Sequence, residues 1–316
     1  EKAKSVPKDV DLHKPVIDEI KIACDKCKEI MRRVPDVIDC WYDSGSASFA
    51  QFHYPFENKE RFEKSFPYDF IAEAIDQTRG WFYTLHVLGV LLFDKLTYKN
   101  VVCAGFLVDD RGEKMSKSKG NVLDPWETFE AVGVDSVRLQ MCMTEPGDQK
   151  KISIKSMNET VLPFLNILWN CYIFSKEYLR NKKNPAKTTL YVEDEWICSR
   201  INTVIEKVTA SLEKNDFHHC LNELINFVNE DFSRFYIRII RERTSKNDDA
   251  LTYTLLYVFE LLLALLAPFA VYITDYIYLD IIKHEKSVHF EQWPKKEESD
   301  KRLEDQMIIV RDIITN

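Results

Sequence analysis

A short run between Gly112 and Asn121 carries the residue types best suited to binding phosphate. It holds three lysines and two serines, which are Lys114, Lys117, Lys119, Ser116 and Ser118. Lysine binds phosphate as a point charge, and neighbouring glycines let backbone N–H groups approach the phosphate oxygens. The run therefore predicts a polyphosphate-binding loop, while a solvated turn of surface lysines is the plainer alternative.

The segment after this loop predicts a rigid helix that anchors it. Asp124 is a favourable N-cap residue, and Pro125 suits the first helical position because its missing N–H would be unpaired there. Glu127 follows three residues after the cap, as in a capping box. We expect this helix to end at Gly133, a residue type that favours the position after a helix.

Strand and helix patterns alternate on both sides of the loop. The strand candidates are the start of 35–46, 68–73 and 101–108, and the helix candidates are 76–93 and 135–143, the latter capped by Asp135. Residues 62–66 are expected to form an aromatic linker. This alternation indicates an α/β fold, in which ligands bind at the carboxyl ends of strands.

Helical patterns alone follow from residue 156. Apolar residues recur at helical spacing in four segments, separated in part by polar linkers at 182–185 and 245–248, and these segments are 161–179, 195–213, 220–241 and 249–276. They predict an all-α helix bundle. The expected domains are a connective segment at 1–35, an α/β domain at 36–155, the bundle at 156–300 and a further segment at 301–316.

The overall composition limits the function classes. A net charge of -8 gives no general attraction to nucleic acid or to an anionic membrane. The 8 cysteines stand mostly singly within apolar runs, which predicts reduced thiols and a cytoplasmic protein. The longest apolar run, 251–273, is interrupted by Glu260 and Pro268, so we expect a buried helix and no membrane span.

Cys24 and Cys27 have the spacing of half a zinc knuckle, in which two thiolates bind Zn²⁺ from one tight turn. A closed structural zinc site needs four ligands, and no second Cys-x-x-Cys follows. His13 and His53 are the remaining partners to consider. A plain hairpin turn or a degenerate knuckle without metal is therefore favoured over zinc.

Three segments resemble one enzyme family. Residues 114–118 match the KMSKS signature of class I aminoacyl-tRNA synthetases without change. Residues 36–46 resemble the Trp-Phe-Asp-Ser-Gly-Ser segment of the isoleucyl-tRNA synthetases, and residues 73–81 resemble their Glu-Gly-x-Asp-Gln-x-Arg-Gly-Trp stretch. Residues 166–170 and 266–269 resemble the family's anticodon-binding helices. The resemblance implies the second half of a Rossmann-type catalytic domain followed by an anticodon-binding bundle.

The chain departs from the family pattern in three respects. It contains no HIGH-type histidine motif and no segment long enough for the inserted editing domain, and Ala74 stands where the family usually has glycine. The first residue is not Met, and the amphipathic segment at the carboxyl end stops without a cap. We therefore expect a fragment, truncated in its last segment and inactive by itself.

The resemblance also implies roles for individual residues in activating L-isoleucine with ATP and Mg²⁺ and in transferring it to tRNA(Ile). Lys114 and Lys117 would stabilise the charge on the departing pyrophosphate. Trp41 and Trp81 would form apolar walls of the amino-acid pocket, with Asp43 beside them, unless both tryptophans are ordinary core residues. The positions implied for ATP or adenylate are Glu73, Asp76, Gln77, Gly105, Phe106, Met115, Ser116 and Ser118. An ion pair between Asp76 and Arg79 is the structural alternative for part of this set.

Contact with tRNA is predicted for a basic stripe on the bundle. Arg234, Arg238 and Arg241 fall at i, i+4 and i+7, on one face of an α-helix, where they could bind phosphate. Salt bridges to Glu230, Asp231 and Glu242 are the alternative. We expect the full-length protein to be a monomer. A valine-specific class I synthetase and a non-catalytic tRNA-binding module are the competing functions.

Overall fold

The computed structural model describes residues 9–37, 39–180, 182, 185, 188–282 and 286–315. Residues 1–8 of the predicted connective segment, Ile38 of the first predicted strand and part of the linker at 182–185 lie outside the described residues. The chain divides into two compact units, one of residues 1–71 with 76–101 and one of residues 72–75 with 102–316, and each is described by itself. The domain boundaries expected at 35, 155 and 300 stay predictions.

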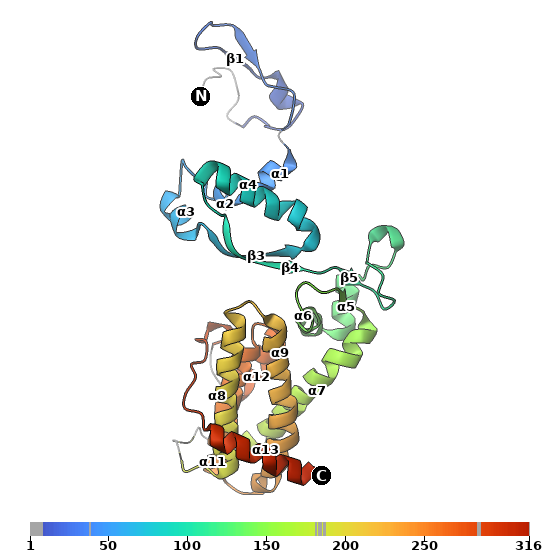
Figure 1. Cartoon of the computed structure of the whole chain (residues 1–316), viewed down its shortest axis with the longest axis vertical. Coiled ribbons are helices and arrows are strands. Elements are labelled where there is room, and N and C mark those ends of the chain that lie inside the picture. The colour runs from blue at the N-terminus through green and yellow to red at the C-terminus, as the bar shows by residue number, and fades with distance from the viewer. Residues whose placement is uncertain are drawn as a thin grey trace. The chain divides into compact units, whose positions relative to one another are not determined.

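The first unit begins with a hairpin and continues in short helices (Figure 1). Strands β1 and β2 pair antiparallel, with Lys21 opposite Arg32 and Ala23 opposite Ile30. The elements of this unit are β1 (Lys21–Ala23), β2 (Ile30–Arg32), α1 (Cys40–Gly45), α2 (Ala47–Ala50), α3 (Lys59–Ser65) and α4 (Trp81–Phe93).

Two predictions for residues 35–66 are wrong. The predicted strand at the start of 35–46 gives way to helix α1, because the Asp39 carboxylate accepts a hydrogen bond from the Trp41 N–H at 2.7 Å and caps a helix there. The predicted linker at 62–66 is mostly helix α3. Its Phe62 is buried and packs on Phe93, with ring centroids 5.3 Å apart.

The strand predicted at 68–73 is confirmed as β3 (Tyr68–Ala74), which pairs with β4 (Tyr98–Ala104). The helix predicted from Asp76 begins only at Trp81, because residues Ile75–Arg79 form a 3-10 turn instead. The Gln77 side chain accepts the Trp81 N–H at 2.9 Å at the start of this helix.

The strand predicted at 101–108 is interrupted at Gly105. The Gly105 N–H donates to the Pro146 carbonyl oxygen at 2.7 Å, which removes it from the β4 ladder. A Cβ at this position would lie 2.0 Å from the Asp148 carbonyl oxygen, so only glycine permits this approach. The strand resumes as β5 (Leu107–Val108), which pairs parallel with β6 (Lys150–Lys151).

The two helices after the loop are α5 (Pro125–Val132) and α6 (Val134–Cys142). The Asp124 carboxylate accepts the N–H groups of Trp126 and Glu127 at 2.8 and 3.0 Å, so the predicted cap is confirmed. Gly133 ends α5 with a positive φ of 80°, also as predicted. Asp135 is not the cap of α6.

Asp135 caps a distant helix instead. Its carboxylate accepts the Tyr272 and Ile273 N–H groups, the latter at 2.8 Å, at the start of α12 (Val271–Ile281). The sequence suggested that this carboxylate caps its own helix, α6. Its actual partners at the start of α12 come within reach because α6 packs against α12. The segment after the lysine loop is thereby attached to the bundle.

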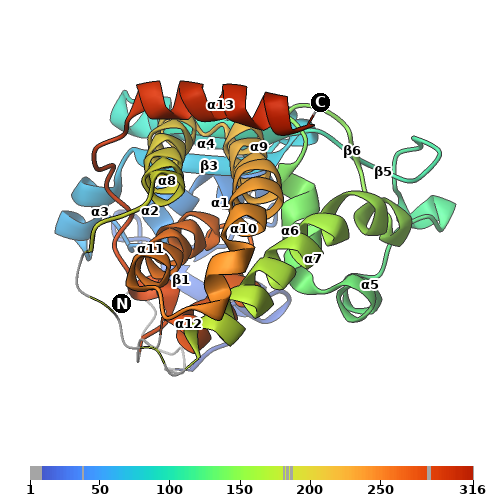
Figure 2. The ribbon, with the colours of Figure 1, turned by 90° about the horizontal axis from the view of Figure 1, so that it is seen from below.

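The bundle predicted from residue 156 is present (Figures 1 and 2). Its helix α13 crosses α8, as Figure 2 shows. The helices are α7 (Ile154–Leu179), α8 (Val192–Leu212), α9 (Phe217–Asn226), a π-helical segment (Phe227–Tyr236), α10 (Ile237–Ile240), α11 (Asp249–Leu266), α12 (Val271–Ile281) and α13 (Lys301–Thr315).

The last of the four predicted bundle helices is divided at Pro268. Proline lacks the N–H that an α-helix requires, and α11 therefore ends at Leu266. Arg138 of α6 donates to the carbonyl oxygens of Pro268 and Phe269 at 2.8 and 3.2 Å. The division of the helix thus provides acceptors that join α6 to the bundle.

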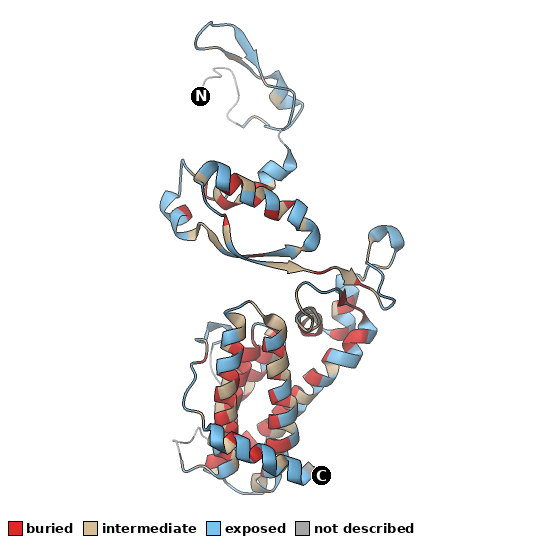
Figure 3. Cartoon of the chain, in the orientation of Figure 1, coloured by how far each residue is buried: buried red, intermediate tan, exposed pale blue. Residues whose placement is uncertain are grey.

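Buried residues line the faces that the bundle helices turn to one another (Figure 3). Phe227, Phe232 and Phe259 are fully buried at its centre. Helix α11 is long and apolar enough to cross a membrane by length and composition, with a mean hydropathy of 1.7, and 61% of it is buried inside the protein. Its apolar side chains pack in the core of the bundle, as expected for a core helix.

Candidate functional site

The lysine loop extends from β5 as a hairpin. Val108 forms an antiparallel bridge to Lys114, and the Met115 N–H donates to the Leu107 carbonyl oxygen at 3.0 Å. Gly112 turns the chain with a positive φ of 79°, which glycine adopts without strain. Residues Lys117–Lys119 then form a single 3-10 turn, which ends at Gly120.

The charged and hydroxyl groups of the loop are open to solvent. Lys114, Lys117 and Lys119 are exposed, and Lys119 pairs with Glu113 at 3.1 Å. The hydroxyl oxygens of Ser116 and Ser118 lie 3.2 Å apart. The loop therefore presents two amines, those of Lys114 and Lys117, for which the structure shows no acidic partner within the described residues.

A cavity of ≈ 550 Å³ lies beside this loop, and its lining includes Gly105, Phe106, Lys114 and Met115. The Lys114 Nζ lies 3.4 Å from the centroid of the Phe106 ring, which holds the amine over the aromatic face. The structure thus brings three of the predicted ATP-binding residues and the predicted catalytic Lys114 to one cavity. Ala74 also lines it, so the extra methyl group faces this space.

Glu73, another predicted ATP-binding residue, is exposed on β3 next to Ala74. Asp76 and Gln77 belong to the other compact unit. There the Gln77 amide nitrogen lies 3.5 Å from the Asp76 carboxylate, so Asp76 contacts its neighbour in the chain. The predicted adenylate-binding set is therefore divided between the two units.

The two tryptophans predicted for the amino-acid pocket lie close together in the first unit. The Trp81 Nε1–H donates to the Ser44 carbonyl oxygen at 2.9 Å, which fixes the indole on helix α1. A Cβ at Gly80 would lie 2.9 Å from the edge of the Trp41 ring. Trp41 is 41% exposed, and Trp81 is half-buried. Neither is a fully buried core residue, and Asp43 is exposed on the same helix.

The predicted basic stripe does not lie on one α-helix. Arg234 is in the π-helical segment, Arg238 in α10 and Arg241 in the 3-10 turn that follows, so ideal α-helical spacing does not apply. All three side chains are exposed. Arg234 pairs with Glu230 at 2.6 Å, as the alternative interpretation expected.

Two neighbours of this stripe serve the bundle itself. Tyr236 is fully buried and donates to the Asp194 carboxylate at 2.7 Å. Arg243 pairs with three carboxylates, those of Glu193, Asp194 and Asp248, at 2.7 to 2.9 Å. These side chains stabilise the fold and are not free to bind tRNA.

Cys24 and Cys27 lie in the turn between β1 and β2. The Cys24 N–H donates to the Glu29 carbonyl oxygen at 2.8 Å, and the Lys28 N–H donates back to Cys24 at 3.0 Å. Backbone N–H groups, that of Cys27 foremost, lower the pKa of the Cys24 thiol. This geometry fits half of a zinc knuckle. No third His, Cys, Asp or Glu gathers beside the two thiols in the part of the chain that the structure describes.

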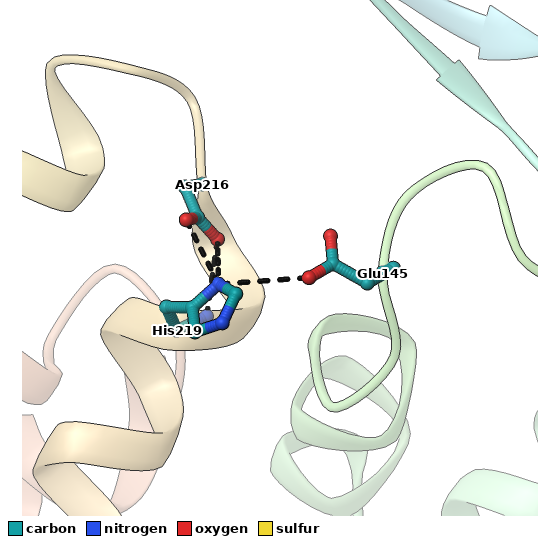
Figure 4. Close-up of side chains that lie close together, drawn as sticks. All are labelled: Glu145, Asp216 and His219. Atoms are coloured by element: carbon teal, nitrogen blue, oxygen red, sulfur yellow. Dashed lines mark hydrogen bonds and ion pairs between the residues drawn. The ribbon is translucent and has the colours of Figure 1, made fainter.

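A further charged group joins Glu145 to the start of α9 (Figure 4). The His219 Nδ1 lies 2.9 Å from the Asp216 carboxylate and 3.5 Å from that of Glu145. The hydrogen bond with Asp216 is the main cause that raises the pKa of His219. The imidazole of His219 thus lies between two carboxylates. The sequence shows only the local pair, in which Asp216 is the N-cap and His219 follows three residues later.

Two family models match successive parts of the chain. Residues 1–153 match the model for tRNA synthetases class I (I, L, M and V), and residues 194–316 match the model for the anticodon-binding domain of tRNA ligase. The chain is 41% identical to the isoleucine–tRNA ligases of Thermus thermophilus and Pyrococcus abyssi, over 98% and 96% of its length. It spans 31% and 30% of those two relatives, so it corresponds to about a third of their length.

Solved structures show the same fold. The LeuRS of Agrobacterium radiobacter, determined in a ternary complex with tRNA and LeuAMS, superposes with a TM-score of 0.71 at 23% identity and covers 90% of this chain and 36% of that one. The methionyl-tRNA synthetase of Mycobacterium tuberculosis, determined with methionyl-adenylate, gives a TM-score of 0.66 at 18% identity, over 84% and 58% of the two chains. An α/β segment followed by an all-α bundle is thus confirmed. The chain belongs to the class I tRNA synthetases and carries part of their catalytic domain together with their anticodon-binding domain.

Proposed function

We propose that the full-length protein carrying this chain is an isoleucine–tRNA ligase. It would activate L-isoleucine with ATP to isoleucyl-adenylate and pyrophosphate and then transfer the acyl group to tRNA(Ile). The relatives named above support the amino acid and the reaction. The observation that carries the chemistry is the position of Lys114, whose amine lies over Phe106 at the cavity beside the lysine loop.

The first step needs charge stabilisation more than covalent chemistry. The isoleucine carboxylate attacks the α-phosphate, and negative charge develops on the departing pyrophosphate. The exposed amines of Lys114 and Lys117 would stabilise this charge, while Ser116, Ser118 and the loop N–H groups hold the phosphate oxygens. When bound to ATP, Mg²⁺ neutralises part of the phosphate charge.

The cavity of ≈ 550 Å³ lies in the size range of small-molecule sites. A cavity that binds adenine needs few polar groups, because adenine is recognised mainly through the faces of its ring and a small number of hydrogen bonds. Gly105 lines this cavity, and the Phe106 ring offers an apolar surface. These two residues would contact the adenosine part of ATP, and Met115 would close the cavity on the side of the loop.

Trp41 and Trp81 would bind the isoleucine side chain, with Asp43 beside them. Both indoles retain exposed surface, as residues of a binding pocket do. Such a pocket discriminates against one missing methylene by only about 1–3 kcal/mol. Glu73, Asp76 and Gln77 would bind the amino group and the ribose of the adenylate.

The bundle would bind tRNA(Ile) through its exposed arginines. Arg238 and Arg241 are the better candidates, because Arg234 already pairs with Glu230. The same proposal includes a cytoplasmic location and a monomeric full-length protein. Zinc at Cys24 and Cys27 remains less favoured than a turn without metal.

The test is amino-acid-dependent ATP–pyrophosphate exchange by the full-length protein. Isoleucine is expected to support exchange far better than valine or leucine. A preference for valine would overturn the isoleucine assignment, and the absence of exchange with any amino acid would favour a non-catalytic tRNA-binding protein.

Single substitutions connect this activity to the loop. Lys114→Ala and Lys117→Ala are each expected to lower kcat by about 100- to 1000-fold, the usual effect of removing one group that stabilises developing charge. The matched control is Lys64→Ala on α3, an exposed lysine that pairs with Glu60 at 2.7 Å, which should leave kcat unchanged.

A further inference from the structure

The lysine loop is closed by two side chains that lie outside its KMSKS residues. Asp109 directly follows β5, and Asn121 follows Gly120, whose positive φ of 67° reverses the chain after the 3-10 turn. These two side chains meet across the base of the loop, where the Asn121 Nδ2 donates to the Asp109 Oδ2 at 2.9 Å. We refer to this pair as the Asp109–Asn121 clasp.

Asn121 uses both ends of its amide. Its Oδ1 accepts the Ser116 N–H at 2.9 Å, and its Nδ2 also lies 3.4 Å from the Lys114 carbonyl oxygen. A backbone N–H can only donate, and a carboxylate or carbonyl can only accept, so all three contacts require the same orientation of the amide. One side chain therefore fixes the backbone on both sides of Met115.

Asp109 holds the other half of the hairpin. Its Oδ1 accepts the Arg111 and Glu113 N–H groups at 2.9 and 3.0 Å, and its own N–H donates to the Glu113 carbonyl oxygen at 3.0 Å. The hydrogen bond from Asn121 is the main cause that lowers the pKa of Asp109, so the carboxylate stays ionised and acts only as an acceptor. The neighbouring Asp110 bonds Ser153 instead, at 2.8 Å.

We propose that Asp109 and Asn121 are positioning residues that hold the backbone of residues 114–116 so that Lys114 and Lys117 meet the phosphates in a fixed geometry. The inference rests on the proposed function and deepens it, because neither side chain needs to touch a substrate. Preorganised charge is effective only when its position is set before the reaction, and small displacements of such groups are costly to the rate.

The test exchanges the two side chains of the clasp in the full-length protein. Asn121→Asp places two carboxylates face to face, which removes the hydrogen bond and adds repulsion. The double exchange Asp109→Asn with Asn121→Asp restores one donor opposite one acceptor. It also keeps an acceptor for the Ser116 N–H and another for the N–H groups of Arg111 and Glu113.

Asn121→Asp is expected to lower kcat for isoleucine-dependent ATP–pyrophosphate exchange by about 10- to 100-fold, with KM for isoleucine unchanged. The double exchange should recover kcat to within about fivefold of the unmodified protein. The matched control is Asn158→Asp, the same chemical change at an exposed position of α7, which should have no effect. An unchanged kcat in Asn121→Asp, or no recovery in the double exchange, would overturn the proposal.

Hydrogen exchange of the Ser116 amide gives a second readout that needs no substrate. It should be faster in Asn121→Asp and slow again in the double exchange, and equal protection in all three proteins would contradict the clasp. If the unmodified protein shows no ATP–pyrophosphate exchange, the proposed function fails, while the hydrogen exchange still decides for or against the clasp.

Discussion

Basic residues serve different ends in the bundle and in the lysine loop. The Arg243 and Arg200 side chains of the bundle are only 15% and 17% exposed. Each is surrounded by carboxylates, and Arg200 pairs with Asp231 at 2.8 Å and with Glu304 at 3.3 Å. In the loop, by contrast, Lys114 and Lys117 are exposed, and the Lys114 amine lies over the Phe106 ring, with no carboxylate paired to it among the residues that the structure describes.

This difference separates structural charge from charge that is available to a ligand. A buried cation must be paired inside the protein, because desolvation without a partner is costly. An exposed amine held by backbone geometry keeps its charge for a ligand. Burial and pairing, which sequence spacing does not show, therefore decide which basic residues are candidates for binding.

The largest expected effect is on the bundle. Arg243→Met leaves the fully buried carboxylate of Asp194 without its cation, and we expect the free energy of unfolding to fall by about 3–5 kcal/mol. Urea unfolding followed by far-ultraviolet circular dichroism measures this loss. Arg238→Met, at an exposed position of the same region, should stay within about 0.5 kcal/mol. Equal losses in the two variants would contradict the distinction between buried, paired arginines and exposed basic residues.

The next effect concerns the support of the loop, which depends on a close backbone approach and not on charge. Gly105→Ala would place a methyl group 2.0 Å from the Asp148 carbonyl oxygen. The chain must move to relieve this overlap, at a cost of about 1–3 kcal/mol to the free energy of unfolding. Gly147→Ala, where nothing lies within 4 Å of the added methyl group, is the control measured in the same urea series.

A smaller effect is expected at the helix that follows the loop. Asp124→Ala removes the acceptor of two N–H groups at the start of α5 and should cost about 1 kcal/mol. Asp124→Asn should cost less, because asparagine is an equally good N-cap residue. Thermal unfolding of the two variants in parallel checks the order, and a larger loss in the asparagine variant would contradict this role.

The smallest effect is a dependence on pH at His219. Its pKa is raised in the folded protein, so its contribution to stability is full below the unfolded pKa of about 6.5 and is lost as pH rises through the folded value. His219→Gln should therefore lower Tm at pH 5.5 and leave it unchanged at pH 9. A Tm difference that persists at pH 9 would show that the imidazole acts through packing.

Local sequence signals predicted part of the molecule well. The Asp124 cap, the break at Gly133 and the bundle helices predicted at 161–179 and 195–213 follow from short-range preferences, and the structure confirms them. The helices predicted at 220–241 and 249–276 are each divided, the first by a π-helical segment and the second at Pro268. The strand predicted at the start of 35–46 is wrong, because the Asp39 carboxylate caps the short helix α1 at this point in the chain. The prediction that Arg234, Arg238 and Arg241 lie on one face of an α-helix is also wrong, because their backbone passes through π, α and 3-10 geometry.

The candidate site could be predicted only in its residue types. The KMSKS match predicted which lysines and serines to examine, but it did not indicate that Asn121 joins Asp109 beneath them. The role of Ala74, Gly105 and Phe106 around one cavity also depends on contacts between segments far apart in the chain. Such contacts leave no fixed spacing in the sequence.

The sequence by itself predicted the class of the protein through its resemblance to the KMSKS signature. It also predicted the chemistry of the lysine loop, because charge and hydroxyl content are local properties of neighbouring residues. Only the tertiary structure decided which charges are free. Arg243 and Asp135 look like available polar residues in the sequence, and the packing of distant helices gives each of them a structural partner. The free energy of burying a charge depends on all the segments that surround it, and these meet only in the fold.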